Sequence, residues 1–147
     1  MVIRVMSSYN GRARELTEAV IKTSGHDLYT DTHLGYDLIV APDLEIILTP
    51  NQLAEPKLGA LIFHPSPLPR MRGRNAIKRQ YKAGDIIGGG TWFWANAGID
   101  CGAVAEREMV IIDPSVRPSV YYDKIILPLM VRTLGTVLLK LSEGVKV

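Results

Sequence analysis

Short apolar runs alternate with helix-like segments along this chain, and this alternation most constrains its fold. Val2–Met6 is a mostly β-branched run, and a segment with helical spacing follows it until Gly25. Asp37–Ala41 is a further apolar run, and Ala60–Phe63 is apolar on both faces, which suits a strand in the middle of a covered sheet. The pattern predicts an α/β fold, with a mostly parallel sheet and helices on both faces.

Capping and spacing signals predict the remaining elements. Leu44–Leu48 is a short apolar strand candidate, and Thr49, Pro50 and Gln52 then form the signature of a capping box at a helix start. The later predicted elements are a helix over Asn75–Ala83, strands over Gly90–Ala95 and Ala103–Ile112, and a closing helix that Ser119 caps, that runs through Leu141 and that is kinked at Pro128.

Length and composition favour one ordinary globular domain. The chain has 147 residues, of which 47% are hydrophobic and 22% are charged, so a single domain over residues 1–147 is expected. The formal charge of +2 identifies no class of partner. The single cysteine, the absence of a secretory pattern and the interruption of the most apolar segment by Pro128 and Arg132 predict a cytoplasmic protein without a membrane span. No histidine or cysteine pair has metal-ligand spacing, so no metal cofactor is expected.

His64 is the first candidate for catalysis, because it follows a predicted strand and begins a segment stiffened by prolines. Ligands of such sheets bind beyond the carboxyl ends of strands, and an imidazole there can exchange protons near neutral pH. A histidine that fills a turn is the alternative. Asp100, in a glycine-containing turn after a tryptophan-rich strand, would favour catalysis if it meets His64, since a base with an orienting carboxylate is typical of acyl-transfer sites.

Basic residues between Arg70 and Lys82 form a second candidate site. No acidic residue lies among them, so they could contact phosphates, a polyglutamate tail or RNA; a solvated surface is the alternative. Nucleic-acid binding has weak support because aromatic residues are not interleaved. The candidate anion contacts are Arg70, Arg72 and Arg74.

The segment FHPSPLPRMRGRNAI, followed by GGGTWFWANAGIDCGAV, resembles the catalytic core of the 10-formyltetrahydrofolate-dependent formyltransferases. That family has a His-Pro-Ser-Leu-Leu-Pro pattern, a glycine-containing loop and an aspartate in a Leu-Asp-x-Gly turn. His64 and Asp100 are 36 residues apart, the separation that the family's catalytic histidine and aspartate keep. The sequence FWANAGIDCG is most similar to the hydrolase domain of 10-formyltetrahydrofolate dehydrogenase.

The resemblance implies a formyltransferase (Rossmann-like) fold with a shortened N-terminal half, because strand–helix material between Gly25 and Asp37 is missing. It implies 10-formyltetrahydrofolate as formyl donor. His64 would stabilise or protonate the tetrahedral intermediate, and Asp100 would hold the charge of the histidine or a bridging water. The implied pterin-binding residues are Glu45, Ile46, Ile47, Leu48, Ala95, Asn96, Ala97 and Gly98.

The resemblance leaves the acceptor open between an amine and water. Family members that formylate amines usually carry an asparagine two residues before the histidine; here Ile62 can donate no side-chain hydrogen bond to an oxyanion. The similar hydrolase domain also has an apolar residue there. We therefore expect an enzyme that passes the formyl group to an amine or to water, with a non-catalytic relative that binds folate or a phosphorylated ligand as the alternative. A homodimer with contacts around Ile125–Val131 would offset the lost sheet area.

Overall fold

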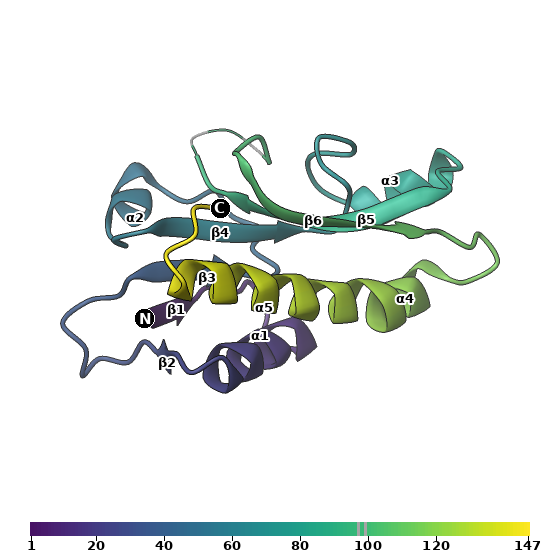
Figure 1. Cartoon of the computed structure of the whole chain (residues 1–147). Helices are drawn as coiled ribbons and strands as arrows, with labels where there is room; N and C mark the ends of the chain where they lie inside the picture. Colours follow the sequence, from purple (N-terminus) through teal and green to yellow (C-terminus); the bar gives the residue numbers. More distant parts are fainter. Residues whose placement is uncertain (97, 99) are drawn as a thin grey trace.

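Six strands form a single sheet in the computed structural model, which describes residues 1–96, 98 and 100–147 (Figure 1). The strands are β1 (Val2–Val5), β2 (Asp27–Leu28), β3 (Leu38–Ala41), β4 (Gly59–His64), β5 (Ile87–Trp94) and β6 (Val104–Ile111). Their order across the sheet is β2-β1-β3-β4-β5-β6. The pairs β2–β1, β1–β3 and β3–β4 are parallel, whereas β5 runs antiparallel to β4 and β6. The predicted α/β class with a mostly parallel sheet is confirmed.

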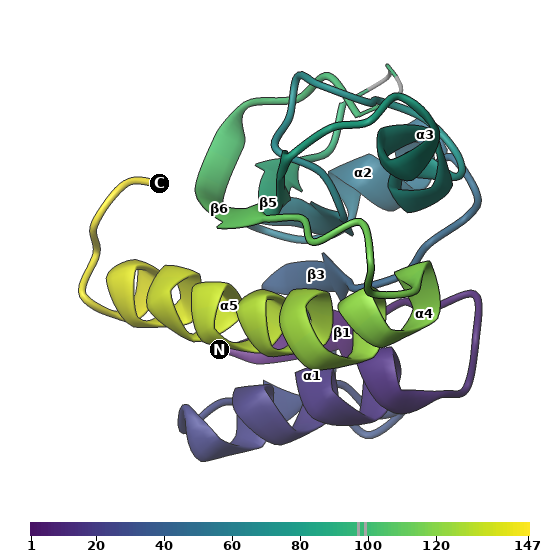
Figure 2. The same ribbon diagram turned by 90° about the vertical axis from the view of Figure 1, so that its right-hand side faces the viewer.

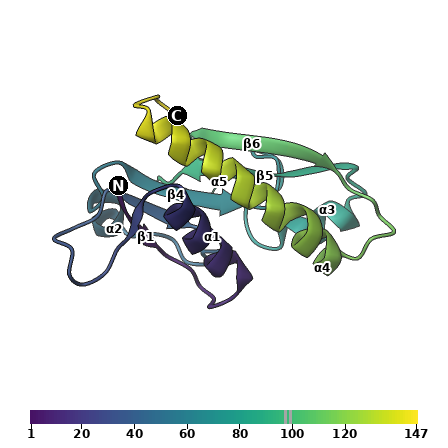
Figure 3. The same ribbon diagram turned by 60° about the horizontal axis from the view of Figure 1, so that its bottom comes forward.

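Helices lie on both sides of this sheet (Figure 2). One side carries α1 (Arg12–Thr23) and a closing helix made of α4 (Pro118–Tyr121), the π-helical turn η1 (Tyr122–Ile126) and α5 (Leu127–Ser142). The other side carries α2 (Pro50–Ala54) and α3 (Ala76–Lys82), of which α3 also contacts α4. From below, α1 and α5 run side by side across the strands (Figure 3).

The central strands alternate between two apolar clusters, one on each face. Leu38 and Val40 of β3 join the larger cluster under α1 and α5, while Ile39 joins the smaller cluster beside α2. The larger cluster also buries Trp92, whose indole N–H donates a hydrogen bond to the Met130 carbonyl at 3.1 Å. Alternation with a period of two on a strand covered on both faces explains why these runs are apolar throughout.

Leu44–Leu48 is a loop, so the prediction of a strand there is wrong. The loop leads from β3 to α2, and Ile46 and Ile47 are 59% and 60% exposed. Both edges of β3 are already paired, with β1 and β4, so this run finds no free edge of that strand. The capping box that follows is confirmed, because Thr49 Oγ1 accepts from the Gln52 N–H at 3.2 Å and Gln52 Oε1 accepts from the Thr49 N–H at 2.9 Å.

The closing helix begins without the predicted side-chain cap. Ser119 lies inside α4, because Pro118 takes the first helical position and Arg117 the N-cap. The wide turn η1 precedes Pro128, which has no N–H to donate to the preceding turn. The span Pro118–Ser142 is long and apolar enough to cross a membrane, but core helices pass the same test, and this one packs against β5, β6 and α1.

The segment Ile125–Val131, which the sequence suggests as a dimer contact, lies mostly in the core. Four of its residues are buried: Ile126, Leu127, Leu129 and Met130. Ile125 is 39% exposed and offers little apolar area for a second copy. A homodimer stays a prediction that this segment does not support.

Residues 29–37 connect β2 to β3 without a helix, and side chains cover this part of the sheet instead. Tyr29 and Tyr36 pack edge to face with ring centroids 5.0 Å apart. The Arg4 guanidinium lies 5.7 and 5.4 Å from the centroids of these two rings, and the Tyr36 hydroxyl donates a hydrogen bond to Glu55. The connection agrees with the shortened N-terminal half that the family resemblance implies.

Candidate active site

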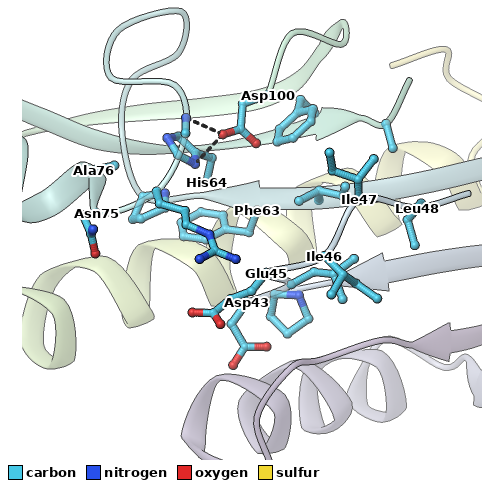
Figure 4. Close-up of a pocket in the computed structure, with 18 of the residues that line it drawn as sticks. Asp43, Glu45, Ile46, Ile47, Leu48, Phe63, His64, Asn75, Ala76 and Asp100 are labelled. Atoms are coloured by element: carbon cyan, nitrogen blue, oxygen red, sulfur yellow. Dashed lines mark hydrogen bonds and ion pairs between the residues drawn. The ribbon is translucent and has the colours of Figure 1, made fainter. Parts of the chain in front are cut away.

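A cavity of about 600 Å³ lies beyond the end of β4, and both predicted catalytic residues line it (Figure 4). His64 is the last residue of β4 and is only 7% exposed. Asp100 belongs to the loop between β5 and β6, and its carboxylate points at the imidazole. The sheet edge that general rules assign to ligands is therefore where these two side chains meet.

The loop that carries Asp100 has a backbone that few sequences allow. Asp100 has a φ of 49°, in the left-handed region that aspartate tolerates better than most residues. A Cβ atom on Gly102 would lie 1.6 Å from the carbonyl oxygen of Trp94, so only glycine fits there. The Asn96 side chain accepts a hydrogen bond from the Gly98 N–H at 2.8 Å, as in an Asx turn. The glycine turn read from the sequence is thus what lets the loop fold back close to β5.

His64 lies between two oxygen atoms. Its Nδ1 is 3.3 Å from Oδ2 of Asp100, and its Nε2 is 2.7 Å from the carbonyl oxygen of Met71. The same Oδ2 accepts a hydrogen bond from the Gly73 N–H at 2.8 Å. Because a carbonyl oxygen can only accept, the contact with Met71 assigns a proton to Nε2. Neutral His64 then turns the Nδ1 lone pair toward Asp100, and a proton taken up there lies between the ring and the carboxylate.

Burial is the main cause that lowers the pKa of His64 below its usual value. The Met71 carbonyl and the Asp100 carboxylate act in the opposite direction because they stabilise the imidazolium, while the positive charge of Arg79 lowers the pKa further. The ring is therefore neutral near pH 7 and can accept a proton. Once protonated, it is a stronger acid than a histidine in water.

Most residues that the family resemblance assigns to the pterin line this same cavity. They are Glu45, Ile46, Ile47, Leu48, Ala95, Asn96 and Gly98. Ala97, the remaining one, lies outside the described residues. Ile62, two residues before the histidine, also lines the cavity. Apolar walls next to backbone polar groups suit a flat ring with polar edges.

The three arginines proposed as anion contacts have different surroundings. Arg74 lines the cavity, whereas the exposed Arg72 lies outside its lining. Arg70 also lies outside it and donates two hydrogen bonds to the Asp85 carboxylate, at 2.9 and 2.5 Å. The structure therefore brings only Arg74 to the residues around His64.

Several polar residues of the cavity were not identified from the sequence, among them Asp43 and Tyr122. Asp43 follows β3 and accepts a hydrogen bond from the Ser7 hydroxyl, and burial raises its pKa. Tyr122 comes from η1, and burial, with a contribution from nearby Asp43, raises its pKa to about 12. The position of Asp43 just after a parallel strand could have indicated it. Nothing in the sequence marks the π-helical turn that brings Tyr122 here.

A second cavity, of about 890 Å³, adjoins the first and lies beside β1 and α1. Four residues line both cavities: Leu44, Glu45, Ile46 and Arg74. Within the described part of the chain, no group of three or more histidine, cysteine, aspartate or glutamate residues could hold a metal ion. The site thus offers an imidazole, carboxylates and hydroxyls for chemistry.

Comparison with known proteins decides the family. The model of the formyl transferase family matches residues 2–127. This chain belongs to the formyl transferase family. It is similar to cytosolic 10-formyltetrahydrofolate dehydrogenase from Homo sapiens, with 31% identity over 111 residues, covering 76% of this chain and 12% of the relative. It is also similar to methionyl-tRNA formyltransferase from Methylobacterium nodulans, with 36% identity over 121 residues, covering 80% of this chain and 36% of the relative.

Solved structures show the same fold at low sequence identity. HypX from Aquifex aeolicus, solved in complex with tetrahydrofolic acid, matches with a TM-score of 0.85 and 22% identity, covering 98% of this chain and 27% of that one. Phosphoribosylglycinamide formyltransferase from Streptococcus pneumoniae matches with a TM-score of 0.77 and 18% identity, covering 96% of this chain and 98% of that one. The predicted family and its fold are confirmed, although the chain spans only 10–14% of the length of its dehydrogenase relatives.

Proposed function

We propose that this domain takes the formyl group from 10-formyltetrahydrofolate and passes it to an amine or to water. The observation that supports this most is the position of His64 and Asp100, 3.3 Å apart in one wall of a largely apolar cavity. A titratable pair in the wall of such a cavity is the expected arrangement for proton transfer at a bound carbonyl. The family membership of residues 2–127 supports the same reaction class.

The folate would bind against the loop that holds Ile46 and Ile47. These side chains are 59% and 60% exposed, so folding leaves them in contact with solvent, and a flat apolar ligand would cover them. Ala95, Asn96 and Gly98, from the loop between β5 and β6, line the same cavity and would contact the pterin. The tetrahydrofolic acid in the related HypX structure supports a folate ligand for this fold.

The proposed reaction needs one proton to move. The acceptor attacks the formyl carbon, and the carbonyl π electrons move onto oxygen to form a tetrahedral intermediate. The acceptor loses a proton to Nδ1 of His64, and Asp100 stabilises the imidazolium that results. The oxyanion then re-forms the carbonyl double bond as the bond between the carbon and N10 of the folate breaks, and the proton passes from Nδ1 to N10. The products are tetrahydrofolate and either a formamide or formate.

Different residues favour the two acceptors. The carboxylates of Asp43 and Glu45 lie across the cavity from the His64–Asp100 pair and could accept hydrogen bonds from an amine (Figure 4). The adjoining second cavity leaves room for a larger acceptor. Ile62 favours water, because it lines the cavity and its aliphatic side chain offers no donor to an oxyanion.

Product analysis separates these acceptors and also tests the binding-only alternative. Purified protein is incubated with 10-formyltetrahydrofolate, with and without a panel of small amines, while tetrahydrofolate, formate and formamides are quantified and folate affinity is measured. Formate alone indicates hydrolysis, and a formamide indicates transfer to an amine. Measurable folate affinity with no release of tetrahydrofolate under any condition would overturn the enzymatic proposal in favour of a binding protein.

A further inference from the structure

We propose that Arg79 of α3 is a positioning residue that holds the loop Met71–Arg74 in the shape that fixes both His64 and Asp100. The inference rests on the proposed function, since it concerns the same pair. Arg79 does not line the cavity, and its effect is transmitted through the backbone of the loop.

The guanidinium of Arg79 donates hydrogen bonds to three carbonyl groups of this loop. Its Nη2 donates to the carbonyl oxygens of Arg72 at 2.7 Å and Met71 at 3.3 Å, and its Nε donates to the carbonyl oxygen of Arg74 at 2.8 Å. Its Nη1 also lies 3.6 Å from the Met71 sulfur. Only arginine carries several donors in one rigid plane, so a lysine at this position could not make all of these contacts together.

The backbone of the same loop contacts both catalytic candidates. The Met71 carbonyl lies 2.7 Å from His64 Nε2, and the Gly73 N–H donates to Asp100 Oδ2 at 2.8 Å. The first contact selects the tautomer of His64, and the second fixes the rotation of the Asp100 carboxylate. A change in the path of this loop would therefore displace both side chains at once.

The loop needs such support because its own backbone conformation is unfavourable. Met71 has a φ of 57° and Gly73 a φ of 90°, both in the left-handed region. A residue with a side chain stays in this region only where its surroundings hold it there. The carbonyl of Met71 is held from both sides, by His64 and by Arg79.

The charge of Arg79 also acts on His64. The charged groups that shift the pKa of His64 are Asp100, which raises it, and Arg79, which lowers it; Asp43, Glu45 and Arg74 also line the cavity. A neutral residue at position 79 removes the lowering contribution. Because releasing Met71 also removes the larger contribution of its carbonyl, which raises the pKa of His64, that pKa is expected to fall further, and the preference for a proton on Nε2 weakens.

The test compares Arg79→Gln and Arg79→Lys with the wild type. Lys78→Gln is the matched control, because Lys78 is the exposed basic neighbour on the same helix. Imidazole NMR measures the tautomer and pKa of His64, which is one of only three histidines and is assigned by comparison with His64→Gln. Single-turnover release of tetrahydrofolate measures the effect on the reaction, and folate affinity is measured separately.

We expect Arg79→Gln to slow turnover on the order of 10–100-fold with little change in folate affinity. It should also lower the pKa of His64, because the contact with the Met71 carbonyl is lost, and reduce the Nε2–H tautomer. Arg79→Lys keeps the charge but not the planar donors, so it should lose the tautomer preference and lower the pKa of His64 at least as much as Arg79→Gln. Lys78→Gln should change neither the turnover nor the pKa and tautomer of His64.

An unchanged His64 tautomer in both folded variants, with turnover within twofold of the wild type, would overturn the inference. If Arg79→Gln does not give a folded amide spectrum, Arg79→Lys alone decides between the outcomes, because the loss of tautomer preference does not depend on charge. If the wild type itself releases no tetrahydrofolate, the proposed function fails, but the tautomer of His64 still tests the positioning role of Arg79.

Discussion

Nδ1 of His64 lies 3.3 Å from Oδ2 of Asp100, although the two residues are 36 positions apart and the strand β5 lies between them in the sequence. The distance is longer than a strong charge-assisted hydrogen bond, and a third group, the Gly73 N–H, already occupies the same carboxylate oxygen at 2.8 Å. The pair is thus held together through its surroundings, and a substrate or a proton can still alter the contact.

Asp100→Asn tests the electrostatic role of the carboxylate. The amide keeps a similar size but cannot stabilise an imidazolium, so turnover should fall on the order of 10²–10⁴-fold while folate affinity changes little. Single-turnover tetrahydrofolate release checks this. Asp113→Asn, in an exposed turn that contacts Ser115, is the control and should turn over at the wild-type rate.

The lowered pKa of His64 predicts a stability change at acid pH. Because the pKa in the folded protein lies below that of the unfolded chain, about 6.5, the unfolded state binds more protons, and the free energy of unfolding falls as pH drops from there through the folded pKa. Urea denaturation between pH 5 and 8 measures this change in the free energy of unfolding.

His26 also has a pKa lowered by burial, so the two histidines must be separated. His64→Gln should reduce the decrease in the free energy of unfolding at acid pH. His26→Gln should leave the part of that decrease that His64 causes. If the free energy of unfolding of His64→Gln fell with pH as steeply as that of the wild type, His64 would not be a buried neutral ring.

Ile62→Asn tests whether the side chain at position 62 determines the choice between an amine and water as formyl acceptor. Ile62 lines the cavity two residues before His64, so an asparagine there could donate a hydrogen bond to the developing oxyanion. We expect the ratio of amine formylation to hydrolysis to rise, at a cost of about 1–3 kcal/mol in the free energy of unfolding from the polar group in a half-buried position. Product ratios and urea denaturation measure both effects. Ile62→Leu is the control, and an equal shift of the ratio there would show that the amide is not responsible.

Gly102→Ala tests whether the Asp100 loop must approach β5 closely. The added Cβ would overlap the carbonyl oxygen of Trp94, so the loop must move and the His64–Asp100 contact should open. We expect tetrahydrofolate release to fall at least as much as in Asp100→Asn, with a folded amide spectrum. In Gly135→Ala, the new Cβ meets nothing within 4 Å, so that variant should be active and more stable by up to about 1 kcal/mol.

Local signals in the sequence were sufficient to predict the secondary structure of segments whose conformation depends on local interactions. The capping box at Thr49 and the apolar run at Ala60–Phe63 predicted their elements because hydrogen bonds and side-chain period are local properties. The prediction for Leu44–Leu48 was wrong because an apolar run can line a cavity as well as form a strand. The wall is recognised only once β3 is seen to be paired on both edges.

Only part of the candidate site could be predicted from the sequence. His64 and Asp100 stand in a recognisable pattern, whereas the place of Tyr122 in the cavity depends on a π-helical turn and the role proposed for Arg79 depends on its hydrogen bonds to the loop Met71–Arg74. Neither arrangement follows from residue spacing, because the contacts join elements through tertiary packing. The basic cluster illustrates the same limit: Arg70 pairs with Asp85, and Arg79 binds backbone carbonyls, so charge alone did not reveal their environments.

Single-turnover release of tetrahydrofolate from 10-formyltetrahydrofolate, measured in the wild type and in His64→Ala together with folate affinity, tests the central claim most directly. The account predicts release by the wild type, with release abolished in His64→Ala and folate affinity largely unchanged. Full turnover in folded His64→Ala would contradict the claim that this histidine moves the proton.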